Sequence, residues 1–429
     1  MKQPEKSSSD NSLLLTGLMV AALTPGIVAA GEPPRKAELR VGIDEGDLRG
    51  ADNRVLQAAI DQLAALGGGT VRVGAGRYTL RNALTLRSNV SVLGEPGKTV
   101  LAVCDSVNSP LVCDGDCNER QVTLQQPQGF RVGDGVLVKD KRFGGGFCVT
   151  TATLTEQVNE NTFRISAPLY LDYMVDQKAT AALVFPGIAA YDVHDAMIEG
   201  LTIDGNREKT VHTDGCRSGG IYFFQCKNMT VRNCVVKNYN GDGVSFQVSE
   251  DVVVEDSLFE GNAGLGLHPG SGSQRPTVRR NKSVSNAGDG MFVCWRVRHG
   301  LFEKNELRGN AGFGISIGHK DSDNVFRENL IVSNAKAGVF FREESEPMGA
   351  HRNVFEKNTI VDNNSSGGEK AAVIAIHGHH YGVIFRENTI GNTQAGGPAA
   401  IGILTGKFAK DLVSEKNKFA NLQKENVQE

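Results

Sequence analysis

The sequence of 429 residues predicts an all-β fold in which short strands stack as the coils of a solenoid. A short sequence motif, here called the phrase, recurs in the C-terminal half. It consists of a charged residue, an Asn or Asp, a few apolar residues and often a second Asn. Gly accounts for 51 residues and aromatic residues for 6%, as many tight turns around a narrow core require. The first polar residue of the phrase stands at Asn233, Asp256, Asn281, Asn305, Asn329, Asn358, Asn388 and Asn417.

The spacing of this phrase gives the length of one coil. Successive copies lie 23 to 30 residues apart, and the runs between them are β-type without a helical period. An Asn that recurs at one register suits a turn, where its amide can hydrogen-bond to the Asn of the next coil. Residues one coil apart in the sequence then become neighbours in space.

The N-terminal residues 1–30 are predicted to be a signal peptide. Their apolar run is interrupted at 24–26, and Val28-x-Ala30 fits a signal-peptidase site. We therefore expect a secreted or periplasmic protein with no membrane contact beyond this segment. The net charge of −3 gives no indication of nucleic acid as a partner.

Residues 31–113 are predicted to form an N-terminal cap and the first coils. The apolar residues of 51–66 share one helical face, and Gly67-Gly68-Gly69 ends that helix. Alternating strands follow within 70–93. The segment ADNRVLQAAIDQLAALGGGTVRVGAGRYTL resembles the opening of the pectate-lyase-type right-handed parallel β-helix proteins. This resemblance implies a right-handed parallel β-helix whose first coil is covered by a capping helix.

The rest of the chain divides into three expected parts. Residues 114–186 break the coil length and read as a small β-rich insertion. The repeats resume and run through 187–422, where we expect the site, and a loose tail occupies 423–429.

Eight cysteines and one tryptophan carry further expectations. Cys104, Cys113, Cys117 and Cys148 fall close together and could form one or two disulfides. The four cysteines of the repeats, Cys216, Cys226, Cys234 and Cys294, are interpreted as buried apolar filler. Trp295 follows the inward parity of its strand and is expected in the core.

A candidate site follows from one strand of each later coil, introduced by Gly or Ala. The period of two residues points the residues four and six places after that Gly or Ala outward. The first outward column reads Gln247, His268, Cys294, Gly318, Arg342 and His377. The second reads Ser249, Gly270, Arg296, Lys320, Glu344 and His379. Titratable residues gathered on one wall indicate a functional site.

A cationic wall on an exported solenoid suits an anionic, extended ligand such as a uronate-containing polysaccharide or oligosaccharide. Elimination from a uronate requires a group that neutralises the carboxylate, a base for the adjacent proton and an acid for the leaving oxygen. Arg suits the first task because its fork binds a carboxylate in two places. Lys suits the second where neighbouring cations lower its pKa.

The segment HKDSDNVFRENLIVSNAKAGVFFRE is similar to the catalytic stretch of the alginate lyase and chondroitin B lyase family. The resemblance implies a polysaccharide lyase in which Lys320 is the base, followed by Asn324, with Arg342 one coil later. Asp321 departs from the small residue expected after the Lys. We assign Arg296 as a second neutralising group and His319 or His268 as acid or clamp. Substrate contacts are expected from Gln247, Glu344, His377 and His379.

Three other functions stay open. Asp242 and Asp289, in GDGV and GDGM, could be the paired carboxylates of a glycoside hydrolase, although Asp-Gly before a strand is ordinary turn chemistry. A uronate epimerase shares the proton abstraction of a lyase, and a non-catalytic carbohydrate-binding protein needs only the wall. The sequence assigns no metal site; calcium is the cofactor considered, with Glu343, Glu344 or Glu346 as contributing ligands.

Overall fold

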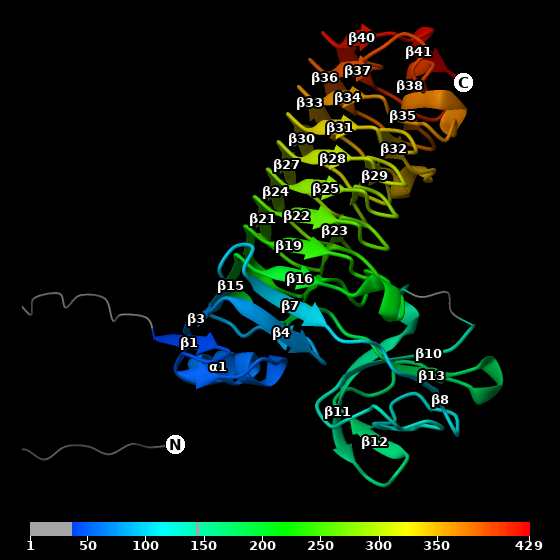
Figure 1. Cartoon of the computed structure of the whole chain (residues 1–429). Helices are drawn as coiled ribbons and strands as arrows, with labels where there is room; N and C mark the ends of the chain where they lie inside the picture. Colours follow the sequence, from blue (N-terminus) through cyan, green and yellow to red (C-terminus); the bar gives the residue numbers. More distant parts are fainter. Residues whose placement is uncertain (1–36, 143–145) are drawn as a thin grey trace, which may run out of the picture. The chain divides into compact units, whose positions relative to one another are not determined.

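The computed structural model describes residues 37–142 and 146–429, and within them the chain forms three parallel sheets and one antiparallel sheet (Figure 1). The parallel strands stack as successive coils, which confirms the predicted right-handed parallel β-helix. The predicted signal peptide, residues 1–30, lies outside the described residues.

Each complete coil contributes one strand to each parallel sheet, here called sheets A, B and C. The strands of sheet A, in spatial order, are β2 (Leu48–Arg49), β1 (Glu38–Gly42), β3 (Gly69–Val73), β6 (Val90–Leu93), β15 (His194–Glu199), β18 (Lys227–Arg232), β21 (Val253–Glu255), β24 (Thr277–Arg279), β27 (Leu301–Glu303), β30 (Val325–Arg327), β33 (Val354–Glu356), β36 (Ile384–Arg386) and β39 (Val413–Glu415). Those of sheet B are β4 (Gly76–Leu80), β7 (Thr99–Val103), β16 (Thr202–Asp204), β19 (Val235–Lys237), β22 (Leu258–Glu260), β25 (Lys282–Val284), β28 (Glu306–Arg308), β31 (Leu330–Val332), β34 (Thr359–Val361), β37 (Thr389–Gly391) and β40 (Lys418–Ala420). Those of sheet C are β5 (Leu84–Thr85), β14 (Ile188–Tyr191), β17 (Ile221–Phe224), β20 (Val244–Gln247), β23 (Leu267–Gly270), β26 (Met291–Phe292), β29 (Ile315–Ile317), β32 (Val339–Phe341), β35 (Ala372–Ile376), β38 (Ile401–Thr405) and β41 (Lys424–Gln428).

The helix α1 (Asn53–Ala65) covers the first coil, as predicted. It begins after Asp52, whose side chain accepts a hydrogen bond from the Arg54 amide at 3.0 Å. Its apolar face buries Leu56, Ala59, Ile60 and Leu63. The helix ends at a run of glycines in which Gly67 has φ of 89°, a left-handed conformation that suits Gly. The cap thus removes from water the apolar end that a solenoid would otherwise expose.

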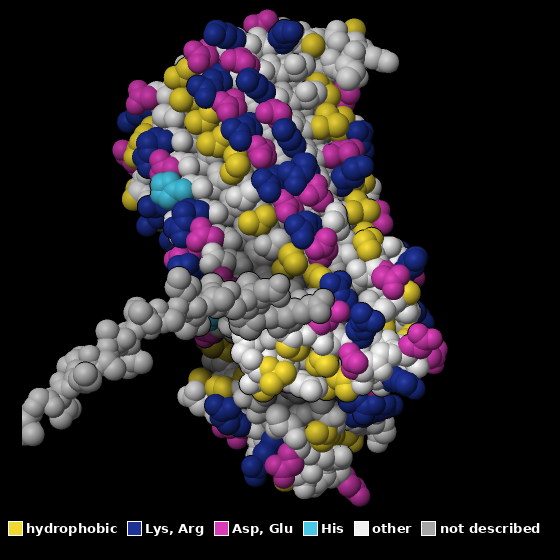
Figure 2. All heavy atoms as spheres, turned by 90° about the vertical axis from the view of Figure 1, so that its left-hand side faces the viewer, with side chains coloured by type: hydrophobic (Ala, Val, Ile, Leu, Met, Phe, Trp, Pro, Cys, Tyr) yellow, Lys and Arg dark blue, Asp and Glu magenta, His cyan; other side chains and the backbone are white. Residues whose placement is uncertain are grey.

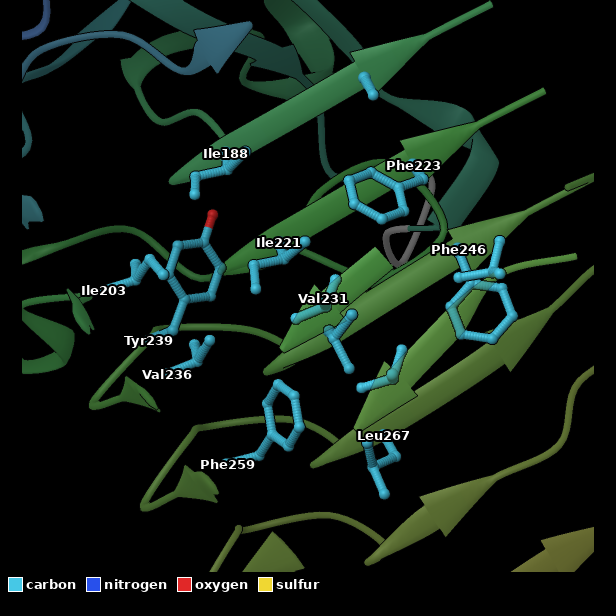
Figure 3. Packing of buried hydrophobic residues seen from close by; sticks show 14 of the residues in the cluster. Ile188, Ile203, Ile221, Phe223, Val231, Val236, Tyr239, Phe246, Phe259 and Leu267 are labelled. Atoms are coloured by element: carbon cyan, nitrogen blue, oxygen red, sulfur yellow. The ribbon is translucent and has the colours of Figure 1, made fainter. Parts of the chain in front are cut away.

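The core fills the space between the three sheets with residues of alternate strand positions (Figure 3). Ile203 and Val236 enter from sheet B, and Ile221 and Phe246 enter from sheet C (Figure 3). Farther along the helix, equivalent aromatic residues stack from coil to coil; the rings of Phe302 and Phe326 have centroids 4.7 Å apart. Coil spacing therefore determines side-chain spacing throughout the core.

The predicted ladder of asparagines is confirmed in the turns between sheets A and B. Asn305 donates from Nδ2 to Oδ1 of Asn329 at 3.0 Å, and Asn329 donates in the same way to Asn358 at 2.9 Å. The predicted register is wrong at the first two copies, because the ladder column contains Ser257, which donates its amide to Asn281 Oδ1, and not Asp256. Asp256, like Asn233, precedes that column and has a left-handed φ.

The insertion is an antiparallel sheet that departs from the coils after β7. Its sheet begins at β8, before the predicted boundary at 114. A small cluster of buried apolar residues, which includes Leu137 and Val149, lies beneath Val211 of the β-helix. Its strands are β8 (Asn108–Pro110), β13 (Thr180–Leu183), β10 (Gly135–Lys139), β11 (Thr150–Gln157), β12 (Thr162–Ile165) and β9 (Gln121–Thr123).

Two expectations, one about the C-terminal tail and one about disulfides, are wrong. The tail expected to be loose forms β41, which pairs in parallel with β38, because the open backbone of β38 offers hydrogen bonds to the next segment. The cysteines that could have formed disulfides are unpaired; all eight lie in the described residues and all are free thiols.

Candidate functional site

The outer face of sheet A is not the candidate site, because its acidic and basic side chains form ion pairs with one another. One outward column alternates acidic and basic residues from coil to coil, and ion pairs join Glu199 to Arg232, Glu255 to Arg279 and Glu303 to Arg327, each at 2.7 Å. Figure 2 shows Lys and Arg interleaved with Asp and Glu over this face. A ligand with negative charge gains nothing from a face whose cations already have partners.

The outer face of sheet C carries the residues of the predicted site. The observed pairing of its strands, however, differs from the alignment used to predict the outward columns. His268 pairs with Ser245 and Gly270 pairs with Gln247, so His268 is not the neighbour of Gln247 in the column. The prediction aligned Gly264 with Gly243, whereas the ladder aligns Gly266 with Gly243. Gly264 and Gly266 stand two residues apart, and a shift of two residues between them leaves the strand parity unchanged, so the sequence does not reveal which of the two introduces β23.

His268 and Asp242 form a buried pair at the start of this face. Nδ1 of His268 lies 2.7 Å from Oδ2 of Asp242, and both side chains are almost fully buried. Burial opposes the charge of His268, but Asp242 and the nearby Cys294 outweigh it and raise the pKa of His268 to about 10. Nε2 of His268 has no hydrogen-bond partner among the described residues. The backbone of Gly215 closes over the pair, because a Cβ there would collide with Asp242 and His268.

Gln247, predicted to contact substrate, is also enclosed. Its side chain is fully buried, donates to Ser245 Oγ at 2.8 Å and packs where Gly270 leaves space. The loop of residues 205–219 produces this burial, since Ser245 Oγ in turn donates to the Gly215 carbonyl at 2.6 Å. The first strands of the wall are therefore covered, and the accessible part begins at β26.

Arg342, predicted to neutralise a substrate carboxylate, is already bound within the protein. Its guanidinium donates to Asp321 Oδ2 at 3.1 Å, to Ser316 Oγ at 3.0 Å and to the Val293 carbonyl at 2.8 Å. It also lies 4.5 Å from the ring centroid of Phe292. Burial raises the pKa of Asp321, and the charge of Arg342 opposes that effect. These contacts make Arg342 a rigid support of the wall.

Asn324, which the resemblance placed beside Lys320 in the site, lies in a turn instead. Its Oδ1 accepts from the Gly300 amide at 2.8 Å, and its Nδ2 donates to Asn353 Oδ1 at 3.1 Å. Asn324 is fully buried and extends a second asparagine ladder. Coil geometry explains the Lys-to-Asn spacing without a catalytic role for this residue.

The accessible group of the wall is a stack of two rings with a carboxylate behind it. The rings of Trp295 and His319, one coil apart, are stacked with centroids 4.2 Å apart. Nδ1 of His319 lies 3.3 Å from Oε1 of Glu344 on the next coil. Trp295 is 38% exposed, which corrects its expected place in the core. Its φ of 57° breaks the strand alternation that the prediction extrapolated.

Two cations flank this stack. Arg296 follows Trp295 and Lys320 follows His319, at equivalent positions of adjacent coils, and both adopt left-handed φ values. Neither side chain has an ion-pair partner among the described residues. This contrasts with the paired cations of sheet A. The structure thus brings together Trp295, His319, Arg296, Lys320 and Glu344, here called the Trp295 cluster.

The predicted histidines of the last coils lie farther along. Nε2 of His377 contacts Oε2 of Glu369 at 2.7 Å, and His379 stacks on Phe408 with centroids 4.4 Å apart. Each therefore has its own partner outside the Trp295 cluster. They extend the same face toward the C-terminal coils.

Asp289, noted in the sequence as a turn residue, has an unusual environment. Its Oδ1 accepts from the Phe313 amide at 2.8 Å, which is the turn role expected. Burial raises its pKa to about 6, against the opposing charges of Lys336 and Arg342. A carboxyl group that is part-protonated near neutral pH is a candidate acid. The GDG pattern alone could not indicate this burial.

Comparisons with known proteins agree with the architecture. A family model described as "Periplasmic copper-binding protein (NosD)" matches residues 157–370 and again residues 271–405, together more than half of the chain. No curated protein matches the sequence.

Solved structures show the same fold. The A-module of the mannuronan C-5 epimerase AlgE4 from Azotobacter vinelandii is 15% identical, with a TM-score of 0.54 over 90% of this chain and 97% of the module. The polygalacturonase from Erwinia carotovora ssp. carotovora is 14% identical, with a TM-score of 0.52 over 92% of this chain and 99% of the enzyme. An epimerase and a hydrolase therefore share this fold, which leaves the reaction to be argued from the site.

The residues present do not fit a preformed copper centre. Copper in proteins is held by Cys, His or Met in groups. Within residues 37–142 and 146–429, no three His, Cys, Asp or Glu side chains come together as a group that could hold a metal ion. His268 lies near Cys294, but its Nδ1 is already hydrogen-bonded to Asp242. Glu343, Glu344 and Glu346, considered as calcium ligands, likewise do not form such a group within the described residues.

In the part of the chain that the structure describes, no helix is long and apolar enough to cross a membrane.

Proposed function

The chain belongs to the NosD family, and we propose that it binds a uronate-containing polysaccharide across the Trp295 cluster and cleaves it by β-elimination. The observation that carries the proposal is the arrangement of His319, stacked on Trp295 and hydrogen-bonded to Glu344, between two cations without acidic partners. The two fold neighbours support a polyuronide substrate, since their names denote enzymes of mannuronan and of polygalacturonate. An exported location accords with the family's description as periplasmic.

Binding follows from the ring stack and the cations. A pyranose ring has apolar faces, and the exposed indole of Trp295 offers a flat surface for one of them. The carboxylate of the same or a neighbouring sugar would be neutralised by Arg296 and Lys320. Neutralisation lowers the charge that must be overcome when the adjacent C5 proton is removed.

His319 is the base in this proposal, in place of Lys320. Glu344 accepts the Nδ1 proton and so leaves Nε2 as the basic nitrogen, in the manner of a base oriented by a third group. Nε2 takes the C5 proton. The electron pair of the broken C5–H bond forms the C4–C5 double bond, and the C4–O bond breaks with its electrons going to the leaving oxygen. The leaving oxygen receives a proton from the Lys320 ammonium or from water. Arg342 and His268 support the wall, because His268 is buried and the guanidinium of Arg342 is bound to Asp321, Ser316 and the Val293 carbonyl.

The test is ultraviolet absorbance of the unsaturated uronate, with alginate, pectins and glycosaminoglycans as substrates. His319→Ala should lower kcat by roughly 10²- to 10⁴-fold. Lys320→Ala should raise KM, because a cation that binds the carboxylate is lost, and should also lower kcat if Lys320 is the proton donor. His299→Ala is the matched control, because this exposed histidine precedes β27 of sheet A on the same coil as Trp295. Elimination that persists in His319→Ala would refute the assignment of the base.

Hydrolysis is the second candidate, and Asp289 is the observation that favours it. Its pKa of about 6 suits a general acid, and Asp242 lies two coils away, on the order of 10 Å at the usual strand spacing, near the upper limit for an inverting pair. New reducing ends without unsaturation, lost in Asp289→Asn and kept in His319→Ala, would establish hydrolysis and exclude elimination.

A further inference from the structure

A cavity of about 580 Å³ lies between the inserted sheet and the loop of residues 205–219. Lys139 reaches it from the end of β10, and Lys141 and Lys178 reach it from neighbouring loops of the insertion. The opposite wall is formed by the loop, at His212, Thr213 and Asp214. None of these residues belongs to the Trp295 cluster.

Three lysines outnumber the two carboxylates that line the cavity, Asp140 and Asp214. Lys139, Lys141 and Lys178 have no ion-pair partner in the described residues. Asp140 cannot serve them, because its carboxylate accepts from the Arg142 side chain at 2.7 Å and 3.0 Å and is itself fully buried. Burial lowers the pKa of Lys139, and contact with the ammonium of Lys178, together with its charge, lowers the pKa of Lys141. Adjacent cations of this kind are stabilised by an anion between them.

A second observation points to a ligand in the same place. Thr213 is 3% exposed, and its Oγ1 has no hydrogen-bond partner among the described residues although it borders the cavity. A buried hydroxyl without a partner is rare unless water or a ligand satisfies it. Leu137 and Val149 add an apolar surface to the same cavity. The cavity therefore combines cations, one hydroxyl and an apolar surface.

We propose that this cavity is a binding subsite for a uronate residue, and the proposal rests on the function proposed above. The lysines would hold the carboxylate, Thr213 would bond to a ring hydroxyl, and Leu137 and Val149 would contact an apolar face of the sugar. The loop connects the subsite to the wall, since Gly215 packs on the buried Asp242–His268 pair. The insertion also meets the Trp295 cluster directly, because the ring centroids of Phe147 and Trp295 are 6.4 Å apart.

The function of the insertion follows from this placement. A polysaccharide chain that occupies both places would be held at two points, and its affinity would exceed that of a short fragment which reaches only one. The cavity lined by Lys139, Lys141 and Lys178, here called the lysine cavity, thus selects acidic polysaccharides, and the Trp295 cluster cleaves them.

The experiment measures binding by calorimetry with the full chain. Oligogalacturonate and oligomannuronate are the anionic probes, a neutral gluco-oligosaccharide of equal length is the comparison, and inorganic phosphate is the competitor. Lys139→Ala/Lys178→Ala should weaken binding of an anionic oligosaccharide by at least about tenfold. Lys227→Ala/Lys304→Ala, which removes two lysines from ion pairs at the edge of sheet A, is the matched control.

Unchanged affinity for the anionic probes in the cavity variant overturns the proposal, and so does an equal loss for the neutral probe. Displacement of phosphate without any binding of the oligosaccharides would show a site for small anions only, which also contradicts a uronate subsite. Thr213→Val, expected to weaken binding about fivefold, decides the matter if the double variant does not fold. A wild-type protein that binds the oligouronate through these lysines but produces no unsaturated sugar would refute the elimination and leave the subsite standing.

Discussion

The Asp242–His268 pair gives the sharpest test of the electrostatics of the wall. Asp242→Asn keeps the shape of the side chain and an oxygen that can still accept from the Leu265 amide, which Oδ1 of Asp242 does at 2.9 Å. It removes the charge that faces His268. Loss of one partner of a buried ion pair costs on the order of 3–5 kcal/mol in the free energy of unfolding.

The free energy of unfolding should depend on pH in a direction that follows from the pKa of His268. The pKa of His268 is raised to about 10 in the folded protein from an ordinary value of 6.5, so the folded state holds the proton more tightly. The stabilisation is complete below about pH 6.5 and is lost as the pH rises toward 10, by up to about 1.4 kcal/mol for each pH unit. Asp242→Asn should remove this slope, because His268 then stays neutral in the fold.

The assay is urea unfolding at pH 6 and pH 9.5, followed by circular dichroism and by the fluorescence of Trp295. The wild type should be more stable than the variant by roughly 3 kcal/mol or more at pH 6, and the difference should narrow at pH 9.5. Asp256→Asn is the control, since its ion pair with Arg280 is solvent-exposed and should contribute less than about 1 kcal/mol. A difference that is small at pH 6, or equal at both pH values, would contradict the reasoning.

Other predictions concern the ladder, the site and metal. Asn329→Ala should lower the free energy of unfolding by about 3 kcal/mol, because it leaves the Phe302 carbonyl and the Asn305 amide without partners. Asn233 is exposed, so Asn233→Ala should cost about 1 kcal/mol or less. Urea titration of both variants checks this. Trp295→Ala should weaken oligouronate binding about tenfold in calorimetry with the melting temperature unchanged, and full affinity in the variant would remove Trp295 from the site. Any hydrolysis should fall as the pH rises through about 6, when Asp289 loses its proton, and a profile that is identical in Asp289→Asn would exclude this acid. Added Cu²⁺ should leave the melting temperature unchanged, because three ligands do not converge in the described residues, and a rise that saturates with copper would contradict this.

The architecture and the ladder could be predicted from the sequence because both depend on local repetition. A coil length of 23 to 30 residues fixes which residues stack, so Asn305, Asn329 and Asn358 were expected to bond in sequence and do so. The helix α1 could likewise be predicted, because its apolar residues recur with a helical period. Lys320 could be placed on the outer wall, because it continues the outward register of Gly318. His319 has the same register as Trp295, so strand parity alone would have pointed it inward.

The state of each side chain on that wall could not be predicted in the same way. Arg342 was expected to meet substrate, but the neighbouring coil supplies Asp321, and that contact consumes its charge. Gln247 and His268 were expected in the groove, but a loop covers them. Trp295 was expected in the core, and a left-handed backbone turns it outward. Such outcomes depend on the lengths of individual turns, which strand parity does not report.

The sequence by itself thus determined the solenoid, its cap and the wall on which a site could stand, because hydrophobic period and repeat length act over short stretches of chain. Only the tertiary structure decided which polar groups of that wall remain available. Burial and ion pairing depend on partners 20 to 30 residues or more away, as for Arg342 and Asp321, and on loops that cross between coils. The lysine cavity was equally invisible, since it requires the insertion to fold against a loop of the β-helix.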